Sequence, residues 1–210
     1  MAIKAKQIRI LLQDYLKAFP EWQALTDYSL ARATGPIMQG ITLYRSHGSD
    51  KYIPTGYIRV LTAPTVVGTM ELPQRLLLPN RAERWITLKS HPRVIDEVIE
   101  ALRRQIVPSL QQPLVPSQVL QLYMHEALPT VSEAYSLATL NAYFGFDTQA
   151  REFCVRYREL ADRLRPYWGT SVYEELGFLS TLEIWLNTGT AREHLAEVLQ
   201  AERVKCGLQP

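Results

Sequence analysis

Apolar residues recur at two different spacings along the chain, and the spacing changes near residue 92. Before that point, apart from one helix at the start, they alternate with polar residues or form short runs rich in β-branched and aromatic side chains, which is typical of strands. After it they recur every three or four residues, which is typical of helices with one buried face. Strands followed by helices predict an α+β fold rather than alternating β/α units.

The exception at the start is an N-terminal helix that is expected to lie on the sheet. Pro20 marks its end, because proline cannot continue a helix. Its apolar stripe consists of Ile8, Leu11, Leu12, Tyr15, Leu16 and Phe19.

The stretch from Gly35 to Leu61 predicts an antiparallel hairpin around which the N-terminal part is organised. Ile37–Arg45 alternates between two faces, and Tyr57–Leu61 is the expected returning strand. The polar cluster His47–Lys51 between them indicates a loop longer than two residues. Gly40 inside the first strand indicates a bulge or a close approach by another backbone.

Three further segments have the composition of strands: Tyr28–Ala33, Val66–Leu72 and Arg84–Leu88. The segment Pro73–Arg81 contains two prolines and is expected to be a loop that crosses a sheet edge. Together these segments predict an antiparallel sheet of about four strands.

The helical period begins with a helix in which Pro92 takes a first-turn position. The chain is then broken by Pro108, Pro113 and Pro116. We therefore expect a mixed α+β part over residues 1–113 and an all-helical part over residues 114–210, packed together as one cooperative unit.

Helix boundaries in the second part are indicated by capping residues. Gly145 and Gly189 each follow a helical run, and Asp147 is expected to cap the helix after Gly145. Three hydroxyl residues precede glutamate by three positions, the capping-box pattern, at Thr130–Glu133, Ser171–Glu174 and Thr190–Glu193. We expect a bundle of four or five helices built from helix-turn-helix hairpins.

Residues 142–152 and 185–193 share an order of aromatic residue, glycine, polar residue and Ala-Arg-Glu. Two hairpins of this kind resemble the small helical repeats of the tetratricopeptide class, which mediate protein contacts. The resemblance covers the final third of the chain, and two units are fewer than a solenoid needs. Two similar hairpins within one bundle are the alternative interpretation.

Composition places the chain among ordinary globular proteins. It has 210 residues, of which 47% are apolar and 21% charged, and its net charge of +2 implies no strong general attraction to nucleic acid. Cys154 and Cys206 lie far apart, so we expect no disulfide framework and a reducing, cytoplasmic location. Neither a signal peptide nor an apolar run of ~18 residues is evident, so no membrane segment is expected. Compact size and the lack of disordered tails favour a bacterial origin.

Catalytic and metal-binding signatures are missing from the sequence. It has no G-x-S-x-G, H-E-x-x-H, phosphate-loop or C-x-x-C motif, and its four histidines are isolated from one another. We therefore expect no cofactor and no metal. An enzyme would need a site assembled from distant residues, for which His125, Glu126 and Arg59 are the candidates.

Arginine and aromatic residues, which dominate binding hot spots, supply the candidate partner-binding residues. A strand group comprises Arg32, Arg45, Arg59, Tyr44 and Tyr57, and a helical group comprises Arg151, Arg158 and Trp168. The strand group belongs either to a sheet with one wet face or to a positive groove for an acidic peptide or phosphate. The helical group forms either a solvated face with ion pairs or a surface for single-stranded nucleic acid.

These observations favour a non-catalytic protein-binding accessory, adaptor or immunity and defence-type protein. Two alternatives stay open. One is a nucleic-acid-binding protein that uses the arginine-bearing helix, and the other is an enzyme whose site is not visible in the sequence.

Overall fold

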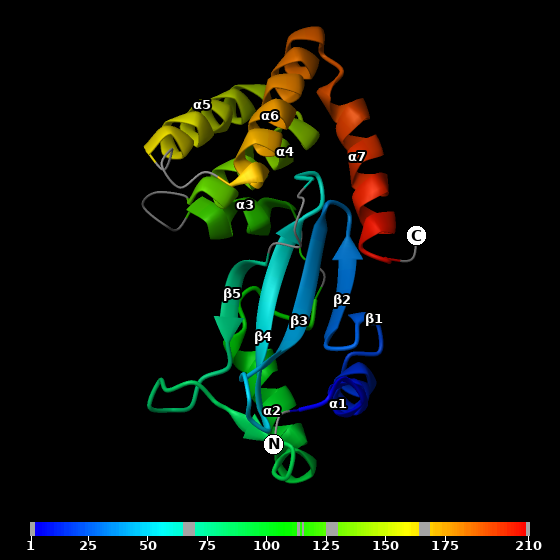
Figure 1. Cartoon of the computed structure of the whole chain (residues 1–210). Coiled ribbons are helices and arrows are strands. Elements are labelled where there is room, and N and C mark those ends of the chain that lie inside the picture. The colour runs from blue at the N-terminus through cyan, green and yellow to red at the C-terminus, as the bar shows by residue number, and fades with distance from the viewer. Residues whose placement is uncertain are drawn as a thin grey trace. The chain divides into compact units, whose positions relative to one another are not determined.

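The computed structural model describes residues 3–64, 70–112, 114, 116–124, 130–163 and 169–208. It has an α+β fold, as the hydrophobic pattern predicts, with one helix, an antiparallel sheet and then a series of helices (Figure 1). The chain divides into two compact units. The first comprises Met1–Arg59 and Leu72–Leu114, and the second comprises Val60–Glu71 and Val115–Pro210. Cooperative unfolding of the whole chain stays a prediction.

The described part of the sheet has six strands, against the four or so expected. They are β1 (Gln23–Thr26), β2 (Ser29–Thr34), β3 (Ile37–Arg45), β4 (Lys51–Val60), β5 (Glu71–Arg75) and β6 (Ile86–Thr87). The first five lie in sequence order across the sheet, and β6 pairs with β4. Short hairpin connections produce this order from β1 to β4.

Two expectations about strand boundaries were wrong. The returning strand begins at Lys51 and not at Tyr57, so Pro54 lies inside it, where its carbonyl accepts a hydrogen bond from the Leu76 amide (3.2 Å). Strand β5 runs from Glu71 to Arg75 through Pro73, although the two prolines of this segment predict a loop. Proline is tolerated in β5 because β5 ends the strand order. Residues 65–69 of the expected strand Val66–Leu72 lie outside the described residues.

Helices α1 (Ala5–Ala18) and α2 (His91–Gln105) form the core of the first unit together with the sheet (Figure 1). Pro20 follows the end of α1, as predicted, and a proline lies in the first turn of α2. The buried cluster includes Ile8, Leu12 and Tyr15 of α1, Val98 and Leu102 of α2, and Leu30, Ile41, Leu43 and Tyr52 of the strands. The predicted apolar stripe of α1 therefore packs on the sheet, together with residues of α2.

The other side of the central strands is buried as well, so the expectation of one wet sheet face was wrong. Every residue from Ile37 to Leu43 and from Tyr52 to Val60 is buried. The β2–β3 register runs without a shift through Ala31 and Gly40, so Gly40 does not mark a bulge there. A Cβ at Gly40 would collide with the Tyr57 ring. The close approach expected at this glycine is made by a side chain and not by a backbone.

In the second unit, the described residues contain five helices. They are α3 (Pro116–Met124), α4 (Val131–Tyr143), α5 (Asp147–Arg163), α6 (Thr170–Thr188) and α7 (Ala191–Lys205). Helix α4 packs against the other four, and its residues Glu133–Ala142 are all buried. It is the centre of the predicted bundle.

The helix-ending glycines and one capping box form as predicted. Gly145 and Gly189 have φ angles of 79° and 72°, a left-handed conformation that glycine adopts without strain. At the start of α4, Thr130 Oγ1 accepts from the Glu133 amide (3.3 Å), and a Glu133 carboxylate oxygen accepts from the Thr130 amide (2.7 Å).

The remaining predicted caps differ in bounds or in their hydrogen bonds. Helix α6 begins at Thr170 after Gly169, which places Ser171 inside the helix. Thr190 precedes α7, but its side chain makes no cap bond and its Oγ1 lies 2.9 Å from Thr188 Oγ1. Asp147 is the first residue of α5 and not the residue before it.

We expect Thr130→Ala to lower the free energy of unfolding by about 1 kcal/mol, because the Glu133 amide loses its acceptor at the start of α4. Thr190→Ala is the matched control. It removes the same atoms from a helix start where no cap bond exists, so we expect a loss of at most ~0.3 kcal/mol. Urea unfolding followed by circular dichroism measures both, and equal losses would contradict the prediction.

Candidate functional site

The strand arginines of the predicted partner-binding set lie apart. Arg32 faces Gln39 across the β2–β3 pair, and its Nε donates to Gln39 Oε1 (3.0 Å). Arg45 is six positions beyond Gln39 on β3, about 20 Å away at the usual strand rise. Arg59 is separated by seven positions from the core residue Tyr52, so strand alternation directs it to the opposite face. The three arginines do not line one groove.

The remaining strand residues differ in accessibility. Arg45 is exposed, with its guanidinium 5.9 Å from the centre of the Tyr28 ring. Tyr44 is also exposed, and the Arg75 guanidinium lies 5.1 Å from its ring centre. Tyr57 is buried and covers Gly40. Of this group, Tyr44 and Arg45 can meet a partner without rearrangement.

The helical group is occupied by contacts between α5 and α6. Arg151 Nη1 donates to Asn187 Oδ1 (2.7 Å). Arg158 donates to both carboxylate oxygens of Glu183 (2.6 and 2.5 Å). These hydrogen bonds raise the pKa of Arg158 and lower the pKa of Glu183. The charge of Arg158 is neutralised by Glu183, and two of its N–H donors are engaged there, so it binds a phosphate weakly. This favours the interpretation of the helical group as a face with ion pairs. Trp168, His125 and Glu126 lie outside the described residues.

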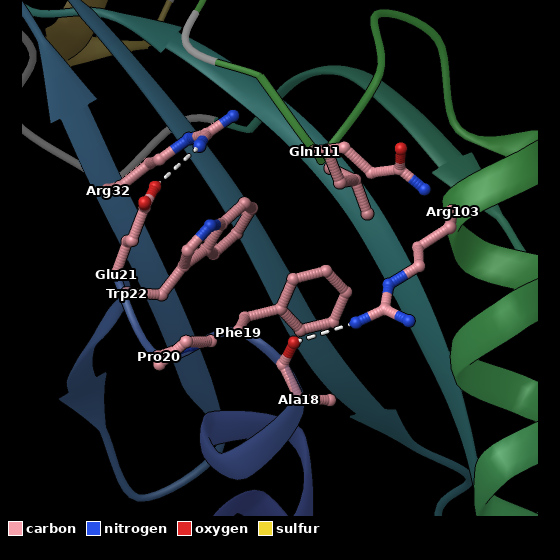
Figure 2. Close-up of a pocket in the computed structure, with 9 residues that line it drawn as sticks. Ala18, Phe19, Pro20, Glu21, Trp22, Arg32, Arg103 and Gln111 are labelled. Atoms are coloured by element: carbon pink, nitrogen blue, oxygen red, sulfur yellow. Dashed lines mark hydrogen bonds and ion pairs between the residues drawn. The ribbon is translucent and has the colours of Figure 1, made fainter.

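The first unit contains a pocket of about 290 Å³ at the C-terminal end of α1 (Figure 2). Its lining residues are Ala18, Phe19, Pro20, Glu21, Trp22, Arg32, Arg103, Leu110 and Gln111. After Ala18 the chain leaves the helix, and the Trp22 amide bonds back to the Phe19 carbonyl (3.0 Å). This turn sets the Phe19 and Trp22 rings 5.3 Å apart, and both side chains are buried. They form an aromatic floor.

Arg32 is the charged group of the pocket. Its side chain is 7% exposed, and its guanidinium lies 5.5 Å from the centre of the Trp22 ring. Nη1 has one contact, Glu21 Oε2 at 3.4 Å, and Nη2 is buried with no hydrogen-bond acceptor among the described residues. Burial lowers the pKa of Arg32 and Glu21 partly offsets this, but an arginine stays charged at neutral pH.

The second arginine of the pocket is satisfied. Arg103 Nη2 donates to the Ala18 carbonyl (2.9 Å) and Nη1 donates to Glu100 (2.6 Å). Its guanidinium lies 5.4 Å from the centre of the Phe19 ring. Figure 2 shows Arg32 and Arg103 on opposite sides of the aromatic floor. The unmet hydrogen-bonding capacity of the pocket is therefore concentrated on Arg32.

Of the pocket residues, Arg32 was among the candidate partner-binding residues from the sequence. Arg103 was missed because α1 and α2 are far apart in sequence and their ends meet only in the folded unit. One local signal was present: two aromatic residues, Phe19 and Trp22, flank the proline that ends α1. Aromatic residues gathered in the loop directly after a helix are a reasonable indication of a binding surface.

A second polar group, in the core of the first unit, links Asp14, His91, Tyr52 and Tyr15. His91 Nε2 lies 3.1 Å from Asp14 Oδ2, and its Nδ1 lies 2.6 Å from the Tyr52 hydroxyl, which lies 3.1 Å from the Tyr15 hydroxyl. A hydrogen bond from Lys17 and one from His91 lower the pKa of Asp14 despite partial burial. Both tyrosines are 0% exposed, so substrate does not reach them and the group is structural.

A similar enclosed group occurs in the second unit. Buried Glu71 accepts hydrogen bonds from the hydroxyls of Tyr123 and Ser136. Ser136 is 0% exposed, so it does not act as a nucleophile on a bound substrate. Among the described residues, no group of three or more histidine, cysteine, aspartate or glutamate side chains is placed to hold a metal.

No helix in the described ranges combines the length and the apolar character needed to cross a bilayer. No protein-family model, curated protein or solved structure matches this chain.

Proposed function

We propose that the protein is a non-catalytic accessory or adaptor protein that holds a segment of another protein in the pocket formed by Trp22, Arg32 and Arg103. The observation that carries this proposal is the buried Arg32 guanidinium, whose Nη2 lacks an acceptor among the described residues and lies beside an aromatic floor. A buried donor left without an acceptor costs about 1–3 kcal/mol. A bound ligand that supplies the acceptor recovers that free energy.

The chemistry of the lining favours binding over catalysis. Trp and Arg are the residues most enriched at binding hot spots, and here they are stacked and largely withdrawn from water. Among the described lining residues there is one carboxylate, Glu21, whose side chain is 75% exposed, and no serine, cysteine or histidine. This lining lacks the pair of convergent titratable groups that acid–base or nucleophilic chemistry requires.

The setting we propose is the reducing cytoplasm of a bacterium, where the thiols of Cys154 and Cys206 stay reduced. An immunity or defence role is one form of such an accessory function. The pairing of Arg158 with Glu183 argues against the nucleic-acid alternative, because it neutralises the centre of the arginine-bearing helix.

The test has two steps. Site-specific photocrosslinking from position 111 captures and identifies the partner, and the affinity of the purified partner for wild type and variants is then measured.

Gln111 is exposed and lines the pocket, so Gln111→Trp fills the opening without removing a buried contact. We expect this change to weaken partner binding at least tenfold, or about 1.4 kcal/mol. Gln112→Trp is the matched control, because Gln112 is an exposed neighbour that does not line the pocket. It should leave binding unchanged.

Two outcomes would overturn the proposal. One is equal binding of the purified partner by wild type and Gln111→Trp, measured by isothermal titration calorimetry. The other is the absence of any specific crosslink from position 111 when the protein is expressed in cells of the organism it comes from.

A further inference from the structure

Resting on the proposed function, we infer that the pocket receives the C-terminal residue of the partner, with its carboxylate on Arg32 and its apolar side chain on Trp22 and Phe19. The first step is the state of Arg32. Nε is held by Gln39, whose own amide nitrogen donates to the Ser109 carbonyl (3.1 Å), so the guanidinium is fixed in orientation. The Nη1–Nη2 edge is left for a ligand.

Glu21 is a weak occupant of that edge. Its Oε2 reaches only Nη1, at 3.4 Å, which is long for a charge-assisted hydrogen bond. Its side chain is 75% exposed, so it moves into water at little cost. A ligand carboxylate displaces Glu21 and accepts from Nη1 and Nη2 together, the bidentate geometry that a guanidinium favours.

The charge balance of the pocket selects a monoanion. Arg103 is engaged by Glu100 and by the Ala18 carbonyl, so Arg32 supplies one positive charge once Glu21 has moved away. A dianionic phosphate would leave a negative charge without a partner among Trp22, Phe19 and Leu110. Placing an unpaired charge in such surroundings is strongly unfavourable. The single negative charge of a carboxylate is neutralised by the single positive charge of Arg32.

The size of the pocket selects a chain end over an internal acidic residue. A volume of about 290 Å³ is at the lower limit for small-ligand pockets and suits a single residue. A C-terminal residue carries its carboxylate and its side chain on the same Cα, so both enter together. An internal aspartate or glutamate brings no apolar group of its own to the aromatic floor.

The probes are N-acetyl-L-phenylalanine, which reproduces a C-terminal phenylalanine, and N-acetyl-L-phenylalaninamide, which has the same shape without the charge. Binding is followed by the NMR signal of the Trp22 indole N–H, assigned with Trp22→Phe. We expect a dissociation constant on the order of 1 mM for the acid, since so small a ligand offers few contacts. The amide should bind at least tenfold more weakly.

Variants of the chain test the role of Glu21 as a competitor. Glu21→Gln should tighten binding of the acid by about threefold to tenfold, because it removes the competing carboxylate. Arg32→Lys should weaken it at least tenfold, because the bidentate edge is lost. Arg93→Gln is the control: Arg93 is an exposed residue of α2 outside the pocket, and its change should leave the dissociation constant within about twofold. The Glu21 result stands even if Arg32→Lys fails to fold.

Failure of this inference is distinguishable from failure of the proposed function. Equal affinity for acid and amide, or weaker binding of the acid by Glu21→Gln, overturns the carboxylate assignment, whereas the Gln111→Trp result decides the partner site separately. The α-amide of N-acetyl-L-aspartic acid, which has a free acidic side chain and a blocked chain end, separates the two carboxylate sources. If it binds as tightly as N-acetyl-L-phenylalanine, the occupant is an internal acidic residue and the inference is wrong.

Discussion

Gly40→Ala is expected to lower the free energy of unfolding by about 3 kcal/mol, near the upper end of the usual cost of overpacking a core. A Cβ at this position would lie less than 3.0 Å from three atoms of the Tyr57 side chain: Cζ, Cε1 and Oη. Both residues are buried in the centre of the sheet, where neighbouring side chains leave the ring little room to move. Urea unfolding of the wild type and the variant gives the difference.

A double-mutant cycle separates this collision from other consequences of the change. In a Tyr57→Ala background the ring is gone, so adding the methyl group at Gly40 should cost less than about 1 kcal/mol. A coupling free energy of about 2 kcal/mol between positions 40 and 57 is therefore expected. If Gly40→Ala costs the same in both backgrounds, the Tyr57 ring is not the reason for the glycine.

The local pattern was sufficient for the end of α1 and for the bounds of β3. The apolar stripe of α1 identifies the buried face of this helix, and Pro20 marks where it ends. The alternating segment from Ile37 to Arg45 has the same first and last residues as β3. Period and proline are local properties, so they can be read from neighbouring residues alone.

Local preference failed as a guide where tertiary contacts override it. Pro54 and Gly56 disfavour a strand interior, yet both lie within β4. The Pro54 carbonyl still accepts from Leu76, and Gly56 leaves room for Ile106, whose Cγ2 would lie 2.6 Å from an added Cβ. Neither compensation is visible from residues 51–60, because both partners come from later in the chain.

The candidate site was only partly predictable for the same reason. Arg32 was identifiable as an arginine on a strand, but the state of its guanidinium depends on Glu21, Gln39 and the packing around them. Arg103 lies 71 positions after Arg32 and joins the pocket through the Ala18 carbonyl. A pocket assembled from a helix end, a strand and a second helix leaves no spacing pattern in the sequence.

Tyr52→Phe is expected to lower the free energy of unfolding by about 3 kcal/mol, because two buried groups lose their partners at ~1–3 kcal/mol each. Its hydroxyl lies 2.6 Å from His91 Nδ1 and 3.1 Å from the Tyr15 hydroxyl. We infer the arrangement in which His91 Nε2 donates to Asp14, Tyr52 donates to His91 Nδ1, and Tyr15 donates to Tyr52. Every proton in this chain of hydrogen bonds then has an acceptor. Removing the central hydroxyl leaves Nδ1 and the Tyr15 hydroxyl unpaired.

Tyr15→Phe is the matched control, since it deletes the same atom from the same kind of buried ring at the end of the hydrogen-bond chain. Tyr52 then still donates to His91, and no buried donor is left without an acceptor, so we expect a loss of about 1 kcal/mol. Urea unfolding of the two variants should therefore give a difference of ~2 kcal/mol in favour of Tyr15→Phe. If the two variants lose the same free energy of unfolding, Tyr52 does not both donate to His91 and accept from Tyr15. The central and the terminal hydroxyl would then stabilise the protein equally, which contradicts this order of hydrogen bonds.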